Sequence, residues 1–355
     1  SGYSAVSHGH AHPELLRVFH EQSSKLSLTS RAFYTDTLGP YLETITKMSG
    51  FEMCLPMNSG AEAVETAIKS SRRWAYRTKG VEPGKAEIIV AEGNFHGRTT
   101  TIISFSSDEN SKDDFGPHTP GFITVKYGCS KSIETAINKN TAAVLIEPIQ
   151  GEGGIIVPPD NYLNEVREIC TKHNVLMLLD EIQSGLGRTG KLFAYEWSEV
   201  NPDIMTIAKA IGNGFPLGAC LTSKKVGEKM DFGSHGSTFG GNPLACTVGN
   251  AVLDIMLKDK FFNEINVVAK KLYEGLQNVI TDFPSVIENV RGRGFILGLK
   301  CKVENDKFVN LAREKYILTV KASDNVVRLL PPINLTLTEC DEAIDKIRAT
   351  CSELK

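Results

Sequence analysis

The chain has 355 residues, of which 41% are hydrophobic and 23% charged, a composition typical of a globular protein with one large and one small domain, or two of similar size. Its formal charge of −3 gives no reason to expect a nucleic acid or an anionic membrane as partner. No apolar segment approaches the roughly 20 residues that a membrane-spanning helix needs. These properties argue against nucleic-acid-binding and membrane proteins.

The 8 cysteines are scattered singly, without a Cys-x-x-Cys pair, which favours free thiols in a reducing compartment over disulfides or a zinc site. The first residues, Ser1–Val6, lack the basic and apolar sections of a signal or transit peptide. They resemble the interior of a protein, so we expect the sequence to begin downstream of its natural N-terminus. We expect a cytoplasmic location, or the mitochondrial matrix in a eukaryote.

Three alternating histidines, His8, His10 and His12, are the first residues with metal-binding chemistry. Pro13 follows them and an apolar pattern begins at Glu14, which favours a turn that enters a helix over 14–26. No cysteine or carboxylate ligand is near in sequence. We therefore expect a structural turn and no metal site.

A second helix, with apolar residues at 42, 45 and 48, is expected to end at Gly50, and the next polar turn leads into a helix that begins near Ala61. Ser59, Gly60 and Ala61 would present free backbone N–H groups and the positive end of the helix dipole to an anion. A phosphate site is the functional interpretation, and an ordinary capped helix is the alternative. The glycine pattern of a dinucleotide site and the lysine of an ATP-binding loop are both missing.

Strands are expected over 87–91 and 142–146, and each is followed by polar residues. After the first strand, Phe95 could stack on a flat ring with His96 beside it, and Arg98 could bind a carboxylate with two hydrogen bonds. A surface ion pair is the alternative for Arg98. After the second strand, Glu147 and Glu152 lie beside glycines as a candidate functional pair.

The apolar runs 175–179 and 204–207 are expected to form buried parallel strands, which end in Asp180 and, two residues beyond the second run, Lys209. In open parallel sheets, chemistry gathers at the carboxyl ends of the strands. An amine that forms a Schiff base and a carboxylate that keeps a ring nitrogen protonated are what a pyridoxal 5′-phosphate (PLP) site needs. The alternative is that Asp180 and Lys209 are polar residues that meet solvent at the strand ends.

Two glycine-bearing loops follow, over 211–218 and 235–243, and the second carries Ser237 and Thr238, whose hydroxyls suit contact with a phosphate. Alternating helices and strands continue to the end of the chain, with Arg328 just ahead of a Leu-Leu-Pro-Pro run. We expect an N-terminal segment over 1–34, a large cofactor-binding domain over 35–257 and a small α/β domain over 258–355.

Six motifs in this order resemble the class III (subgroup II) aminotransferases, which have the PLP-dependent fold of type I. They are MNSGAEAVETAIK at 57–69, NFHGRT at 94–99, EPIQGEGG at 147–154, DEIQSGLGRTGKLFA at 180–194, AKAIGNGFPLGA at 208–219 and GSTFGGNPLAC at 236–246. The resemblance covers nearly the whole chain, although the beginning of the family domain is absent. It implies a mostly parallel central sheet in a large domain, a smaller C-terminal domain, bound PLP and a homodimer with shared active sites.

The resemblance implies a role for each matching residue. Lys209 is similar to the Schiff-base lysine that shuttles a proton, and Asp180 to the partner of the ring nitrogen. The other cofactor contacts implied are Ser59, Gly60 and Ala61 at the phosphate, Phe95 stacked on the ring, His96 beside it, Gln183 at the ring hydroxyl, and Ser237 and Thr238, which reach the phosphate from the second subunit. The substrate contacts implied are Tyr3, Tyr34, Arg98, Glu152 and Arg328.

Two branches of the family are close in their motifs, and they imply different amine donors. SGYSAVSHGHAHP at 1–13 and the tyrosines Tyr3 and Tyr34 resemble the branch that acts on ornithine, whereas DNVVRLLPPINLT at 324–336 resembles the branch that acts on N-acetylornithine in arginine biosynthesis. Because Tyr3 would touch substrate, ornithine with 2-oxoglutarate is the expected pair and N-acetylornithine the alternative. A nicotinamide dehydrogenase is disfavoured because no Gly-x-Gly-x-x-Gly follows a strand, and a catalytically silent scaffold because the key positions are filled.

Overall fold

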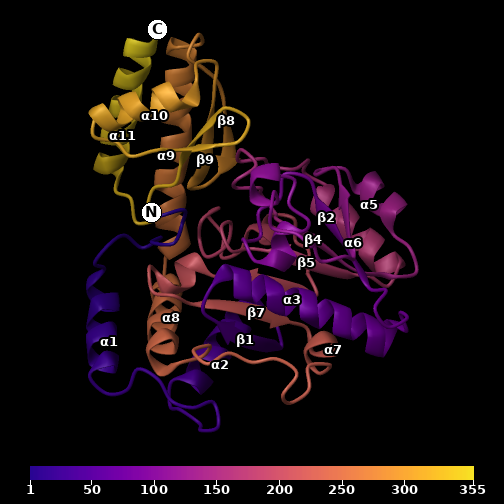
Figure 1. Ribbon diagram of the computed structural model, residues 1–355. Helices are drawn as coiled ribbons and strands as arrows, with labels where there is room; N and C mark the ends of the chain where they lie inside the picture. The colour runs from indigo at the N-terminus through magenta and orange to yellow at the C-terminus, as the bar shows by residue number, and fades with distance from the viewer.

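The computed structural model describes residues 1–355 and contains two sheets (Figure 1). The larger sheet has seven strands in the order β1-β7-β6-β5-β4-β2-β3. Its strands are β1 (Met53–Met57), β2 (Glu87–Ala91), β3 (Phe122–Val125), β4 (Thr141–Ile146), β5 (Leu176–Asp180), β6 (Ile204–Ile207) and β7 (Gly218–Thr222). β7 alone runs in the direction opposite to that of the other six strands, so the predicted mostly parallel sheet is confirmed.

Helices cover both faces of this sheet, because both faces of its central strands are apolar. Successive residues of a strand point to opposite faces. In β5, Met177 and Leu179 accordingly belong to a core shared with α2 (Leu38–Ser49), α6 (Tyr162–Lys172) and α8 (Pro243–Met256). Leu176 and Leu178 belong to a second core, on the side of α3 (Gly60–Trp74). The result is a sheet between two helical layers, which cover its faces but not the carboxyl ends of its strands.

The smaller sheet has the order β10-β11-β9-β8, and all its pairs are antiparallel. Its strands are β8 (Ile287–Arg293), β9 (Ile296–Cys301), β10 (Val320–Ala322) and β11 (Val326–Leu329), and the helices with it are α9 (Phe261–Asp282), α10 (Asn305–Glu314) and α11 (Leu337–Leu354). A separate core of 21 buried residues joins them. In Figure 1 this unit, coloured orange to yellow, lies above the larger sheet and is reached through the long helix α9.

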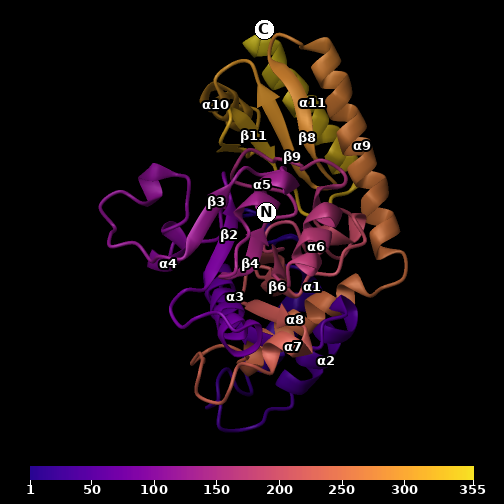
Figure 2. The same ribbon diagram turned by 90° about the vertical axis from the view of Figure 1, so that its right-hand side faces the viewer.

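The N-terminal segment lies where the two units meet, as both ribbon views show (Figures 1 and 2). Ser1 Oγ donates to the carbonyl of Leu330 at 2.7 Å, and the Ile333 amide donates to the carbonyl of Ser7 at 2.7 Å. The amide of His8 donates to Asn213 Oδ1 at 2.8 Å. The segment is therefore bonded to both units before α1 (Pro13–Ser23) packs beside α8.

The histidine run forms the turn that was predicted ahead of α1. The ring of His8 is buried and stacks on Phe261 with 6.0 Å between ring centroids. Burial and the neighbouring charges of His12 and Arg188 lower the pKa of His8 to about 3, so its imidazole is neutral. No group of three His, Cys, Asp or Glu side chains is arranged to hold a metal, and all eight cysteines are free.

The remaining elements are short: α4 (Thr100–Ile103), α5 (Ser130–Ala136), α7 (Lys224–Gly227), a π-helical turn over 75–79 and 3₁₀ turns over 109–111, 194–197 and 209–212. The sequence did not indicate β1, β3, β7 or β10, and Gly218, the first residue of β7, was assigned to a glycine-bearing loop. Asn161 precedes α6, but its side chain makes no capping hydrogen bond. None of the helices is long and apolar enough to cross a membrane.

Glu181 is one of the buried groups that make the stability of this fold depend on pH. Glu181 follows β5 and is only 1% exposed. It accepts hydrogen bonds from Ser184 Oγ at 2.6 Å and from the Tyr195 amide at 2.9 Å. Burial outweighs these bonds and raises the pKa of Glu181 to about 7. Since this pKa lies above its unfolded value, the group's contribution to stability is present at low pH and is lost as pH rises to about 7.

We predict that Glu181→Gln removes this loss. Gln can keep both hydrogen bonds, since its amide can donate to the Ser184 hydroxyl. Relative to the unchanged protein, the free energy of unfolding of the variant should increase by up to about 3 kcal/mol between pH 4.5 and pH 8. Denaturant unfolding of the cofactor-free protein at several pH values measures this difference. Glu288→Gln, at an exposed position of β8, is the control, and a difference independent of pH would contradict the assignment.

Candidate active site

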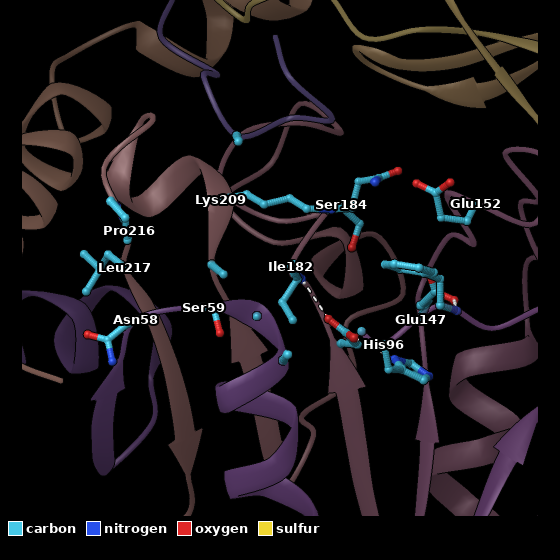
Figure 3. Close-up of a pocket in the computed structure, with 18 of the residues that line it drawn as sticks. Asn58, Ser59, His96, Glu147, Glu152, Ile182, Ser184, Lys209, Pro216 and Leu217 are labelled. Carbon is cyan, nitrogen blue, oxygen red and sulfur yellow. Dashed lines mark hydrogen bonds and ion pairs between the residues drawn. The ribbon is translucent and has the colours of Figure 1, made fainter. Parts of the chain in front are cut away.

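The register between β5 and β6 brings Asp180 and Lys209 to the same edge of the sheet. The two strands are parallel, and Asp180 pairs with Thr206, three residues before Lys209. Lys209 opens a 3₁₀ turn with φ of 52°, a left-handed conformation that costs a non-glycine residue energy and is concentrated at functional sites. Figure 3 shows its side chain extending across a pocket towards Ser184.

This pocket is a cavity of about 340 Å³, which we call the central cavity. Of the predicted site residues, it brings together Ser59, Gly60, Ala61, Phe95, His96, Glu152, Asp180, Gln183 and Lys209. Six predicted residues do not line the central cavity of their own chain: Tyr3, Tyr34, Arg98, Ser237, Thr238 and Arg328. The cavity is of the size that binds small molecules and cofactors in proteins.

A buried pair of Asp180 and His96 forms one wall of the cavity. His96 Nδ1 lies 2.6 Å from Asp180 Oδ2, and the amide of Ile182 donates to Asp180 Oδ1 at 3.0 Å. Burial alone would lower the pKa of His96, but the hydrogen bond and charge of Asp180, with the charge of Glu147, raise it. The pair therefore holds the Asp180 carboxylate in place, and the raised pKa of His96 favours a positive charge on its ring.

The electrostatic environment of Lys209 favours a neutral amine. Burial lowers the pKa of Lys209, and the carboxylates of Asp180, Glu152 and Glu147 oppose this only in part. A neutral amine is the form that attacks a carbonyl carbon and accepts a proton. Burial also raises the pKa of Glu147 to about 7, so this neighbour carries less than a full negative charge near neutral pH.

The N-terminus of α3 forms the floor of the cavity, next to Ser59 in Figure 3. Ser59 caps the helix by accepting a hydrogen bond from the Glu62 amide, and the first amides of the helix have no intrahelical partner. A Cβ on Gly60 would lie 2.9 Å from Ile182 Cδ1, so a larger residue would have to displace the Ile182 side chain. These free amides fit a phosphate group.

The residues present fit PLP, by the following observations. Two buried polar atoms at the cavity, His96 Nε2 and Gln183 Oε1, have no hydrogen-bond partner within the protein. Phe95 presents an aromatic side chain for a flat ring, Asp180 a carboxylate for a ring nitrogen and Lys209 an amine for an aldehyde. Together with the anion site at Ser59, they supply one group for each part of the cofactor.

A second cluster of side chains lies beside the central cavity. Arg328 is 2% exposed and its Nη1 lies 2.5 Å from Glu152 Oε1. The guanidinium carbon of Arg328 stands 5.0 Å from the centre of the Tyr3 ring. The predicted pair of Glu152 and Arg328 is therefore formed, and Tyr3 joins it.

Arg98 lines a neighbouring cavity of about 600 Å³, which shares Phe95, His96 and Glu152 with the central one. Arg98 is exposed, has no ion-pair partner and lies over the Phe95 ring with 5.6 Å to its centre. Its guanidinium is therefore available for a carboxylate. Arg98 therefore does not form the surface ion pair that was the alternative.

Thr238 and Tyr34 line a third cavity, of about 220 Å³, away from the central one. The Tyr34 side chain is fully exposed, and Phe33 and Phe239 beside it are exposed to 70% and 58%. Ser237 is tied to the central cavity indirectly, since Asn58 Nδ2 donates to Ser237 Oγ at 3.0 Å. Within one chain, Tyr34 and Thr238 thus lie together at the surface.

Sequence analysis missed several residues of the central cavity, namely Ala5, Asn58, Ile149, Ile182, Ser184, Phe215, Pro216 and Leu217. The segment with Phe215, Pro216 and Leu217 had been indicated by its glycines, but nothing distinguished these side chains from a surface loop. Asn58 had no signal, because its role is a contact with Ser237, 179 residues away in sequence.

Comparison with known proteins agrees with this geometry. The family model of class-III aminotransferases matches residues 1–351. Ornithine aminotransferase 2 of Staphylococcus aureus (strain MRSA252) is 47% identical over 98% of this chain and 87% of its own length. The crystal structure of ornithine aminotransferase from Toxoplasma gondii ME49 has a TM-score of 0.97 at 36% identity, covering 99% of this chain and 85% of that one.

Two further solved structures bear on the cofactor and on the alternative substrate. Another structure of the Toxoplasma gondii enzyme, with a TM-score of 0.96 at 36% identity over 99% of this chain and 84% of that one, has PLP at partial occupancy in its active site. Acetylornithine aminotransferase from Elizabethkingia anophelis has a TM-score of 0.90 at 41% identity, covering 99% and 88% of the two chains. The chain belongs to the class-III aminotransferases, which depend on PLP.

Proposed function

We propose that this enzyme is an ornithine δ-aminotransferase, which converts L-ornithine and 2-oxoglutarate into glutamate 5-semialdehyde and L-glutamate. The semialdehyde cyclises to pyrroline-5-carboxylate. The observation that carries the proposal is the Glu152–Arg328 pair, closed over by Tyr3, beside Lys209. The name of the relatives at 46–47% identity supports it.

When bound, PLP supplies an aldehyde that takes up the amino group and a ring that accepts the electrons of the broken C–H bond. The Asp180 carboxylate, held by His96, would keep a proton at the ring nitrogen. The amides at Ser59, Gly60 and Ala61 would hold the phosphate, Gln183 would contact the ring hydroxyl and Phe95 would cover the ring. Lys209 Nζ would move the proton of the terminal carbon of ornithine, because its lowered pKa favours the neutral base.

The two substrates use the same pocket with different carboxylate contacts. While ornithine is bound, Glu152 neutralises Arg328, and Tyr3 with Arg98 binds the α-carboxylate of the amine donor. When 2-oxoglutarate enters, Arg328 leaves Glu152 and binds the α-carboxylate, while Arg98 binds the distal one. Bidentate guanidinium contacts suit both carboxylates.

We propose further that the enzyme is a homodimer in which Ser237 and Thr238 reach the phosphate in the partner's site. What supports this is that Thr238 lies outside the central cavity of its own chain, in an exposed aromatic surface. Tyr34 lines the same small cavity as Thr238, so we assign Tyr34 to the partner's site as well.

We also propose the domain division 1–34, 35–257 and 258–355, supported by the two separate sheets and cores. A cytoplasmic location is supported by the bacterial origin of the relatives and by the eight free thiols. A nucleic acid or a membrane has no part in this proposal.

The rates with L-ornithine and N-acetyl-L-ornithine, each with 2-oxoglutarate as acceptor, test the proposal. We expect ornithine to be preferred by about tenfold or more in kcat/KM, since Tyr3 and Arg98 bind a free α-carboxylate next to an unmodified α-amine. Pyrroline-5-carboxylate is trapped with o-aminobenzaldehyde, and glutamate is followed in both reactions. A preference for the acetylated donor would instead place the enzyme in arginine biosynthesis.

We predict that Lys209→Ala lowers turnover by about 10³-fold or more, because Lys209 supplies the only side-chain amine that lines the central cavity. Asp180 and the phosphate contacts are unchanged, so PLP should still bind. Steady-state rates measure the loss, and cofactor absorbance after gel filtration measures binding. Lys139→Ala, at an exposed position, is the control, and turnover of Lys209→Ala close to that of the control would refute the role of Lys209.

Mixed dimers test whether Thr238 acts across the interface. Lys209→Ala and Thr238→Arg should each be inactive alone. If Thr238 serves the partner's site, unfolding and refolding an equal mixture gives heterodimers with one intact site, and about a quarter of the unchanged activity returns. If Thr238 serves its own site, no site is intact and the mixture stays inactive. A heterodimer of Lys209→Ala with Tyr34→Arg tests in the same way whether Tyr34 serves the partner's site.

A further inference from the structure

Arg188 has the largest fully buried side chain of the protein, although it is charged. It lies in the loop that follows β5, eight residues after Asp180. It forms no ion pair with any carboxylate, and its Nε has no hydrogen-bond partner. Burial lowers the pKa of Arg188 to about 9, which still leaves the guanidinium charged at neutral pH.

The guanidinium joins three segments that are far apart in the sequence. Nη1 donates to the carbonyl of Pro331 at 2.5 Å and to that of Phe295 at 3.3 Å. Nη2 donates to Ser7 Oγ at 2.6 Å. Arg188 therefore connects the loop after Asp180 to the smaller sheet and to the N-terminal segment.

Two of these contacts lead directly to the substrate-binding side chains. Pro331 follows β11, two residues after the strand that carries Arg328. Ser7 Oγ in turn donates to the carbonyl of Ser4 at 3.0 Å, and Ser4 follows Tyr3. Arg188 thus holds both partners of the stack in which Arg328 lies 5.0 Å from the Tyr3 ring.

The Tyr3 turn needs such support, because its backbone is strained. Tyr3 and Ser4 have φ of 56° and 72°, and a non-glycine residue keeps this conformation only where the surroundings enforce it. The hydrogen bond that Ser4 accepts from Ser7 is itself anchored by Arg188. Loss of the anchor would let the turn relax and move the Tyr3 ring.

Stability gives no reason for this charge to be buried. A guanidinium surrounded by neutral oxygen atoms costs free energy relative to water, and an apolar side chain of similar size is often more stabilising. Arginine is distinguished by five N–H groups in a rigid fork, which can bond several acceptors in fixed directions. The geometry, not the charge balance, accounts for arginine at this position.

We propose that Arg188 is a positioning residue, which fixes where Tyr3 and Arg328 lie relative to Asp180 and Lys209. It thereby determines where both substrate carboxylates bind relative to the cofactor site. The proposal rests on the proposed function, in which Tyr3 contacts the amine donor and Arg328 the keto acid. The Ser7 contact serves the donor side, and the Pro331 and Phe295 contacts serve the acceptor side.

The variants Arg188→Gln, Arg188→Lys and Ser7→Ala test this in the PLP-loaded full chain. Arg188→Gln should raise the KM of ornithine and of 2-oxoglutarate by about tenfold each, while kcat and PLP binding stay within about twofold. Arg188→Lys should rescue only part of the effect, because an ammonium cannot bond all three acceptors at once. Ser7→Ala keeps the Pro331 and Phe295 contacts and should raise the KM of ornithine alone.

Arg72→Lys is the matched control. Arg72 is half-buried, donates to a proline carbonyl, that of Pro120, at 2.9 Å, and has an Nε without a partner, but it lies away from the site. We expect both KM values of this variant to be unchanged. A melting temperature measured for each variant separates loss of fold from loss of position.

Binding of glutarate, an unreactive dicarboxylate, gives a readout besides turnover. Its dissociation constant, followed by the absorbance of bound PLP, should rise about tenfold in Arg188→Gln and not in Ser7→Ala. This measurement tests Arg188 even if ornithine is not the donor, whereas failure of the unchanged enzyme to use ornithine counts against the proposed function alone.

The proposal is overturned if Arg188→Gln lowers kcat or releases PLP with both KM values unchanged, or if Ser7→Ala affects the two substrates equally. Should Arg188→Gln not fold, Ser7→Ala decides: a rise confined to the KM of ornithine supports the proposal, and an unchanged KM contradicts it.

Discussion

The parallel pairing of β5 with β6 is the constraint on which the active site depends. Both strands are buried on both faces, so their register is fixed by two apolar cores and not by the polar residues that follow them. That register places Asp180 opposite Thr206, and a single left-handed residue then directs Lys209 into the cavity. The scaffold thus sets the distance between the acid and the amine before any cofactor binds.

Burial has opposite consequences for the charged groups around this edge. It depresses the pKa of Lys209, which helps a base, and raises that of Glu147 to about 7, which limits the negative charge near it. The pKa of His96 is raised in spite of its burial, because His96 is hydrogen-bonded to Asp180. The Asp180 carboxylate can then serve a ring nitrogen without a second full negative charge beside it.

The proposed substrate contacts come from elements outside the strands of the larger sheet. Arg328 belongs to β11 in the smaller sheet, Tyr3 to the N-terminal segment and Glu152 to the loop after β4. Their arrangement therefore depends on how the two units and the N-terminal segment are joined. The buried guanidinium of Arg188 lies at that junction. It therefore links the way the units are joined to the proposed binding of the two substrate carboxylates.

The sequence by itself determined the strands and helices with strong periodicity, the helix that begins after Ser59 and the shared edge of Asp180 and Lys209, because each depends on local pattern and on the rule that parallel strand ends share an edge. Only the tertiary structure decided what depends on distant contacts: the antiparallel β7 inside a parallel sheet, the tie between Asn58 and Ser237, the place of Tyr34 beside Thr238, and Arg188. Arg188 stands in a motif that reads as a surface turn, and nothing local indicates burial. Its partners lie 107 to 181 residues away, and that separation leaves no periodicity for the sequence to reveal.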